Sequence, residues 1–170
     1  ESFLRFGHFE LLASRGDDKL LQELMDYSIN RYFPEVTSSG NQKYIDWLKA
    51  VSTRTIDMVV GWYRTGFVHG VMNTDNMSLL GLTIDYGPFS FLDEYSLDFT
   101  PNTTDLPGRR YAFGKQGQIA QWNLWQLANA VYPIIKDESA LQSILDEFGT
   151  EFWQKHDEML AQKFGLDKVL

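Results

Sequence analysis

Chemically capable side chains gather in one glycine-rich stretch of the sequence, between His69 and Gly87. Asp75, Asn76 and Asp85 offer only hard oxygen ligands, which are the ligands that Mg²⁺ prefers. Nine positions separate Asn76 from Asp85 (85 − 76), which is enough for two short strands and a turn. A β-hairpin of this kind would return the second carboxylate beside the amide. The stretch therefore predicts a divalent-cation site built on loops.

The spacing of these residues matches part of the metal-binding motifs of protein kinases. There, a catalytic loop H-R-D-x-x-x-x-N supplies a base and a metal-binding Asn, and D-F-G supplies a metal-binding Asp. His69 and Asn76 match the first and last residues of that loop, and the tripeptide beginning at Asp85 matches D-F-G. Val71 falls at the position of the catalytic Asp and has no proton acceptor. Asp75 is the nearest carboxylate that could replace it.

Longer strings resemble the selenoprotein O family, which is called YdiU in bacteria. They cover nearly the whole chain and comprise 4–10 (LRFGHFE), 69–78 (HGVMNTDNMS), 81–89 (GLTIDYGPF), 108–113 (GRRYAF) and 121–124 (QWNL). The resemblance implies a kinase-like fold and the transfer of a nucleoside monophosphate to Ser, Thr or Tyr hydroxyls of proteins. The family transfers mainly AMP from ATP, and UMP transfer is also attributed to its bacterial members.

The resemblance also implies roles for single side chains. Asp75 matches the catalytic base of the family. Asn76 and Asp85 match its ligands for Mg²⁺ or Mn²⁺, and Asp85 also matches a residue of its nucleotide-binding site. Arg5 matches an arginine that contacts the nucleotide phosphates. The chain departs from the family at Gly117, where the family usually has Pro after Gln.

Other polar side chains near these motifs are expected to have structural roles. We expect His69 to pack and hydrogen-bond within the loop rather than to act as an acid or a base. Arg109 and Arg110 could contact phosphate or a protein substrate, but a structural role in the long loop 98–114 is the expectation.

Apolar periodicity predicts a mainly α-helical fold with one small β-hairpin. The expected helices cover 6–14, about 18–33, about 42–65, about 118–135 and 139–164, and 79–84 is expected to form strand. The resemblance implies that residues 1–170 form a single domain, which is the kinase-like C-terminal lobe. The N-terminal lobe and the C-terminal extension of the family are expected to lie outside this chain.

Composition narrows the classes of partner. The chain has 15 Lys and Arg against 23 Asp and Glu, a net charge of −8, which counts against broad nucleic-acid binding. It has no Cys, and its apolar stretches are too short to cross a membrane. No signal peptide is visible, so a cytoplasmic location is expected, or a mitochondrial one for a eukaryotic member. The expected partners are ATP and protein substrates, without nucleic acid or membrane.

Two other functions remain open from the residues alone. A kinase-like phosphotransferase would use Asp75 as its base in the same way. An inactive pseudokinase-like binding module is favoured by Val71 and opposed by Asn76 and Asp85. The chain also lacks both G-x-G-x-x-G and G-x-x-x-x-G-K-[ST], which cradle phosphates, so we expect little or no transferase activity from residues 1–170 alone.

Overall fold

The computed structural model describes residues 2–167. Within this range the chain forms five α-helices: α1 (Phe6–Ser14), α2 (Asp18–Tyr32), α3 (Gly40–Thr65), α4 (Gln116–Ile135) and α5 (Glu138–Phe164). A two-stranded antiparallel sheet joins β1 (Phe67–Val68) to β2 (Ser90–Phe91). Short 3₁₀ turns interrupt the loops at η1 (Thr74–Asn76), η2 (Thr103–Asp105) and η3 (Phe113–Lys115). The prediction of a mainly α-helical fold with a small β element is confirmed.

The predicted helix boundaries are confirmed to within a few residues. Asp17 caps α2, because its Oδ1 accepts a hydrogen bond of 3.0 Å from the Leu20 N–H. Asp137 caps α5 in the same way through the Ala140 N–H, at 2.9 Å. Gly66 ends α3 in the left-handed conformation, at φ 72°, a conformation that glycine adopts without steric cost.

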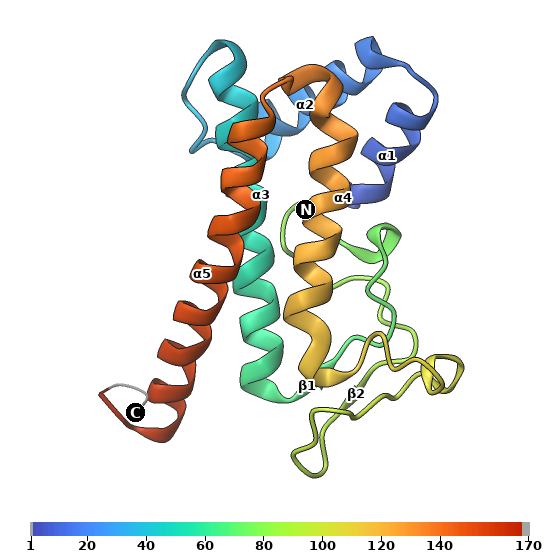
Figure 1. Ribbon diagram of the computed structural model, residues 1–170, viewed down its shortest axis with the longest axis vertical. Helices are drawn as coiled ribbons and strands as arrows, with labels where there is room; N and C mark the ends of the chain where they lie inside the picture. The colour runs from blue at the N-terminus through green and yellow to red at the C-terminus, as the bar shows by residue number, and fades with distance from the viewer. Residues whose placement is uncertain (1, 168–170) are drawn as a thin grey trace.

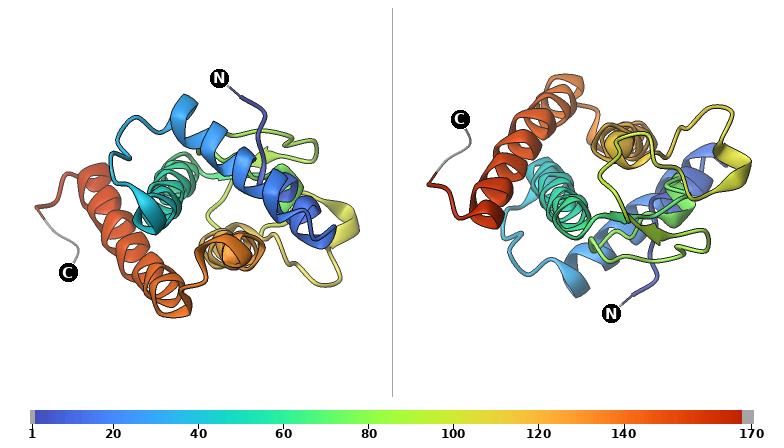
Figure 2. Two further views of the ribbon diagram at one scale, coloured as in Figure 1. Left: turned by 90° about the horizontal axis from the view of Figure 1, so that it is seen from above. Right: turned by 90° about the horizontal axis from the view of Figure 1, so that it is seen from below.

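The three longest helices, α3, α4 and α5, lie side by side, and α1 and α2 cross at one end of them (Figures 1 and 2). One continuous core joins these layers. At its centre Trp47 of α3 is fully buried, with its ring centroid 5.5 Å from that of Phe9 in α1 and 6.5 Å from that of Phe33 after α2. This contact fixes α1 against the helices that carry the rest of the fold. None of the helices within residues 2–167 is both long and apolar enough to pass through a bilayer.

The predicted β-hairpin between Asn76 and Asp85 is wrong. Residues 79–84 contain no strand, and the sheet instead pairs Phe67 with Phe91 and Val68 with Ser90. The apolar run starts with Leu79 buried in the core, and a turn at Gly81 with φ 69° then breaks its extended course. A Cβ at Gly81 would lie 2.5 Å from the backbone oxygen of Arg54 in α3, so the chain follows that helix closely.

Two helical glycines give opposite predictions for stability. A Cβ on Gly61, in α3, would meet no heavy atom within 4 Å, so Gly61→Ala is expected to raise the free energy of unfolding by about 0.5–1 kcal/mol. A Cβ on Gly117, in α4, would lie 2.5 Å from Cζ of the buried Phe152 ring, so Gly117→Ala is expected to lower it by about 1–3 kcal/mol. Urea unfolding of both variants measures the two shifts, and shifts of the same sign would contradict this account of the packing.

Candidate active site

The extended segment that leads into α1 is paired with the segment that follows η1. The Phe6 N–H donates to the Met77 carbonyl at 3.1 Å, and the Leu79 N–H donates to the Leu4 carbonyl at 2.9 Å. These bonds flank an antiparallel bridge between Arg5 and Ser78, so the Arg5 backbone has a fixed place beside the glycine-rich loops.

Arg5 and Asp85 form an ion pair. Nη2 of Arg5 lies 3.0 Å from Oδ2 of Asp85, with the two side chains 33% and 43% exposed. Asp85 has a φ of 51°, in the left-handed region that side-chain-bearing residues seldom adopt. Such backbone strain occurs often at functional sites, where the surrounding structure holds it in place. The predicted phosphate-binding arginine and the predicted metal-binding carboxylate are therefore in direct contact.

Asp75 and Asn76 lie together on η1. Asn73 caps this turn, because its Oδ1 accepts a hydrogen bond of 3.1 Å from the Asp75 N–H. The Asn76 amide nitrogen donates to the Val71 carbonyl at 2.8 Å, which orients the side chain and leaves its Oδ1 as the ligand atom. Sequence reasoning placed these two residues correctly on a loop, although the turn around them differs from a hairpin.

The first turn of α1 also meets the Asp75 carboxylate. A Cβ added to Gly7 would lie 2.0 Å from Oδ1 of Asp75, so only a glycine fits here without moving that carboxylate. Because Gly7 is two residues after Arg5, the start of α1 contacts Asp75 and Asp85 at once. The structure therefore places Arg5 against Asp85 and Gly7 against Asp75 at one helix start, and Asn76 follows Asp75 on η1.

His69 has the structural role that the sequence analysis expected. Its Nε2 lies 2.7 Å from the Ile84 carbonyl, and its Nδ1 accepts a hydrogen bond of 3.3 Å from the Val71 N–H. These two bonds require the neutral tautomer with the proton on Nε2, and burial lowers the pKa of His69 below its ordinary value. His69 thus ties the Asn76 loop to the residue that precedes Asp85.

Sequence reasoning missed two buried amides of α4 that hold the same loop. Gln116 accepts a hydrogen bond from the His69 N–H at 3.1 Å through Oε1 and donates to the Phe67 carbonyl at 3.0 Å through Nε2. Two turns later, Asn123 donates to the Met72 carbonyl at 2.7 Å. Their position on the apolar face of α4 is the signal that could have found them, since a buried amide needs partners.

The oxygen atoms at this site suit a cation that shares its coordination with a substrate. Within residues 2–167, no group of three His, Asp or Glu side chains lies close enough to hold a metal ion alone. Mg²⁺ is commonly held by one or two protein carboxylates together with substrate phosphates, so it needs no such group. The Asn76 Oδ1 atom and the Asp85 carboxylate are oxygen ligands of the kind that this form of binding uses, and Arg5 lies beside Asp85.

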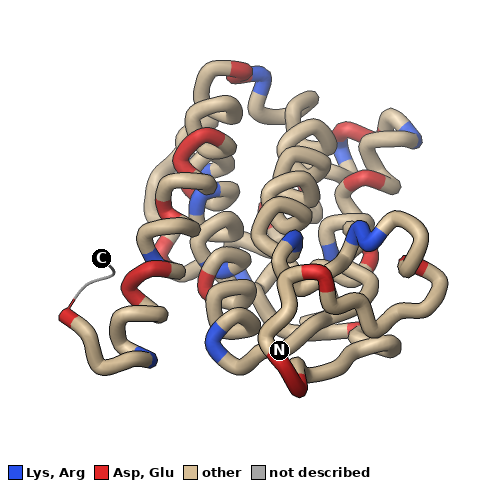
Figure 3. The backbone as a smooth tube through the Cα atoms, turned by 60° about the horizontal axis from the view of Figure 1, so that its bottom comes forward, with Lys and Arg blue, Asp and Glu red and all other residues tan. Residues whose placement is uncertain are grey.

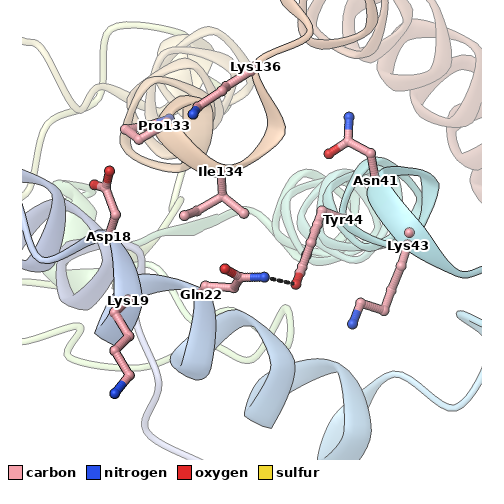
Figure 4. A pocket seen from close by; sticks show the side chains of 10 residues that line it. Asp18, Lys19, Gln22, Asn41, Lys43, Tyr44, Pro133, Ile134 and Lys136 are labelled. Carbon is pink, nitrogen blue, oxygen red and sulfur yellow. Dashed lines mark hydrogen bonds between the residues drawn. The ribbon is translucent and has the colours of Figure 1, made fainter.

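A hollow elsewhere on the surface is separate from this cluster. It has a volume of about 550 Å³ and lies between α2, the start of α3 and the end of α4 (Figure 4). Lys43, on its wall, already pairs with Asp26 at 2.7 Å. None of the four predicted site residues lines this hollow.

Comparison with known proteins identifies the family. A family profile described as "Protein adenylyltransferase SelO" matches residues 1–170. The chain belongs to the SelO family. Relatives named "Protein nucleotidyltransferase YdiU" include those of Cytophaga hutchinsonii, 54% identical over 168 residues, and Flavobacterium johnsoniae, 50% identical over 165 residues. A third, from Xanthomonas oryzae pv. oryzae, is 52% identical over 165 residues.

The matches cover this chain far more fully than they cover the relatives. They include 99% of the chain for the Cytophaga protein and 97% for the other two, but 32% of each relative. The chain therefore spans about a third of the length of these SelO-family proteins. The resemblance read from the sequence strings is confirmed.

Burial of neutral His69 predicts a pH-dependent stability. Because its pKa is lowered in the folded state, the unfolded chain binds the proton more readily, and stability falls as the pH drops below about 6.5. Urea unfolding at pH 7.5 and 5.5 is expected to show a larger loss for the wild type than for His69→Gln. His156→Gln, which leaves His69 in place, serves as the control and should keep the wild-type loss. Equal losses in the wild type and His69→Gln would contradict this assignment.

The Gln116 contacts predict a second effect on stability. Gln116→Leu leaves the His69 N–H and the Phe67 carbonyl without their partner, at a cost of about 1–3 kcal/mol for each buried group. Gln118→Leu, at an exposed position of the same helix, is the matched control and is expected to change stability by less than about 0.5 kcal/mol. Chemical denaturation of both variants compares them, and similar midpoints would show that Gln116 does not hold the loop.

Proposed function

We propose that the protein to which this chain belongs transfers a nucleoside monophosphate, chiefly AMP from ATP, to Ser, Thr or Tyr hydroxyls of proteins. UMP transfer is included in the proposal. The names of the matching family and of its relatives support the class of reaction. One observation in the structure carries the assignment to residues: the start of α1 contacts Asp85 through Arg5 and Asp75 through Gly7.

Asp75 is proposed as the catalytic base. Its side chain is exposed, and no Lys, Arg or His within residues 2–167 forms an ion pair with it. The carboxylate is therefore available to accept the proton of an incoming hydroxyl. A positioned base of this kind contributes about 10²–10⁴-fold to a rate. Gly7 leaves the space in which that carboxylate lies.

Asn76 and Asp85 are proposed to hold Mg²⁺ or Mn²⁺, which would neutralise charge on the phosphates of ATP. Arg5 is proposed to bind those phosphates as well. Its guanidinium lies on Asp85, and its buried Nε has no hydrogen-bond partner within residues 2–167. An arginine with N–H groups that are not already hydrogen-bonded is suited to bidentate recognition of phosphate oxygens.

We further propose that residues 1–170 are a kinase-like C-terminal lobe. The order of elements supports this: a long helix α3, a loop ending in Asn76, the Asp85 turn, an irregular segment and then α4. The bond from His69 to the Ile84 carbonyl links the two metal-binding segments. A cytoplasmic location, or a mitochondrial one in a eukaryotic member, stays a prediction.

Two neighbouring functions use the same site differently. A phosphotransferase would pass on the γ-phosphate, and Asp75 would serve it equally well as a base. A binding module without catalysis is suggested by Val71, which has no proton acceptor at the usual position of the kinase base. The fate of the ATP label separates all three.

The test uses the whole protein with ATP labelled at the α- or the γ-phosphate. Label from the α-phosphate is expected on protein, Asp75→Asn is expected to lower its transfer by about 10²–10⁴-fold, and Asp85→Ala should abolish it because a cation ligand is lost. Asp146→Asn, at an exposed position of α5, is the control and is expected to act as wild type. Transfer of γ-label would favour the phosphotransferase, and full activity in Asp75→Asn would remove Asp75 as the base.

A further inference from the structure

The loop that carries Arg109 and Arg110 is held in shape by Asp105. The Asp105 carbonyl accepts a hydrogen bond from the Arg109 N–H at 2.6 Å. Its carboxylate accepts from the Arg110 N–H at 2.9 Å and from the Tyr111 N–H at 2.8 Å. Arg109 has a φ of 46°, so the backbone here takes a conformation that the loop must impose. The two arginines therefore lie on a turn whose backbone is fixed by Asp105.

Arg110 is further ordered by aromatic rings. Its guanidinium carbon lies 4.6 Å from the ring centroid of Trp122 on α4 and 5.7 Å from that of Tyr111. Stacking of this kind fixes the plane of a guanidinium and leaves the N–H groups at its edge free to donate. Trp122 itself is 42% exposed, so the stacked pair faces the solvent.

Arg110 differs from the other ordered cations in lacking an acidic partner. Arg5, Arg54 and Lys43 each pair with a carboxylate, at 3.0, 2.7 and 2.7 Å. Within residues 2–167, no Asp or Glu side chain forms an ion pair with Arg110. In a chain with 23 acidic residues, a stacked arginine left without one is suited to a carboxylate from another molecule.

This turn lies at the edge of the candidate active site. Asn102, at its start, donates to the Gly70 carbonyl at 3.3 Å. Trp122, under Arg110, is the neighbour of Asn123, which donates to the Met72 carbonyl at 2.7 Å. The loop with η2 and the η1 turn lie on the same side of α4 in both ribbon figures (Figures 1 and 2). The loop that carries Arg110 is thus hydrogen-bonded through Asn102 to the segment that leads into Asp75.

We propose that Arg110 binds an acidic side chain that flanks the acceptor hydroxyl of the protein substrate. The inference rests on the proposed function and adds a substrate preference to it. Lys and Arg positions are interspersed with Asp and Glu over the described part of the chain (Figure 3). Selection by charge would therefore depend on Arg110 rather than on a broad basic face.

The acceptor is favoured over the nucleotide as the ligand of Arg110. Arg5, the proposed phosphate ligand, lies on Asp85 and is bridged to Ser78. Arg110 lies on Trp122 and Tyr111, so the ion pair and bridge of Arg5 and the ring contacts of Arg110 involve different residues within 2–167. Because they are held by different parts of the fold, one can bind ATP phosphates while the other binds the flank of the acceptor.

The test uses the whole protein and matched synthetic peptides with one acceptor hydroxyl, flanked either by Glu or by Gln. Transfer of α-label is expected to favour the Glu peptide by about 3- to 10-fold in kcat/KM, mainly through KM. Arg110→Ala is expected to abolish that preference while the KM for ATP stays unchanged. Arg110→Lys, which keeps the charge without the planar fork, is expected to retain part of it.

Arg31→Ala removes an exposed arginine from α2 and serves as the control, with the wild-type preference expected. Equal use of both peptides by the wild type, or an Arg110→Ala variant that keeps the preference, would overturn this inference alone. A raised KM for ATP with the peptide preference intact would also overturn it, by assigning Arg110 to the nucleotide. Absence of transfer to every peptide and protein tested would overturn the proposed function together with it.

Discussion

The pairing of the Leu4–Phe6 segment with Met77–Leu79 is the constraint on which the candidate site depends. Leu4, Arg5 and Phe6, which lead into α1, contact residues that follow them by some 70 to 80 positions in the sequence. Two backbone hydrogen bonds and one ion pair make these contacts. Without this pairing, Arg5 would have no fixed place and Gly7 would not face Asp75. The core contact between Phe9 and Trp47 holds α1 against α3, so that Arg5 and Gly7 keep their positions. The proposed catalytic groups on loops are thus positioned by a rigid helix.

Buried amides supply the second set of constraints. Gln116 and Asn123 hold three successive parts of the 67–72 segment from α4, and His69 passes the constraint on to Ile84. The bonds from Gln116 and Asn123 are buried, where an unpaired polar atom costs about 1–3 kcal/mol, so the loop has little freedom to shift. Charge is arranged differently: Asp75 and Arg110 face outward without ion-pair partners within residues 2–167, whereas Arg5 and Asp85 face each other. Asp75 and Arg110 are the residues that we propose to meet the protein substrate, and Arg5 and Asp85 are those that we propose to bind phosphates and a cation.

The sequence predicted the helices well because their apolar spacing and their caps act locally. Asp17, Gly66 and Gly165 end or begin helices where the pattern indicated. The hairpin failed because residues 79–84 follow α3 through the Gly81 turn, and that close contact is a tertiary effect with no local signal. The motif spacing located Asp75, Asn76 and Asp85, but only the fold could show that Gly7 abuts Asp75. The roles of Gln116 and Asn123 were likewise hidden, since a polar residue in a helix gives no sign of which distant carbonyl it will bind.

The central claim is that Asn76 and Asp85 converge on one cation beside Arg5. The most direct measurement is a crystal structure of the whole protein with Mn²⁺ and a non-hydrolysable ATP analogue, with the metal located by its anomalous signal. The account predicts a metal peak bonded to Oδ1 of Asn76 and to the Asp85 carboxylate, with Arg5 turned onto the phosphates. A bound nucleotide whose metal contacts neither side chain would contradict it.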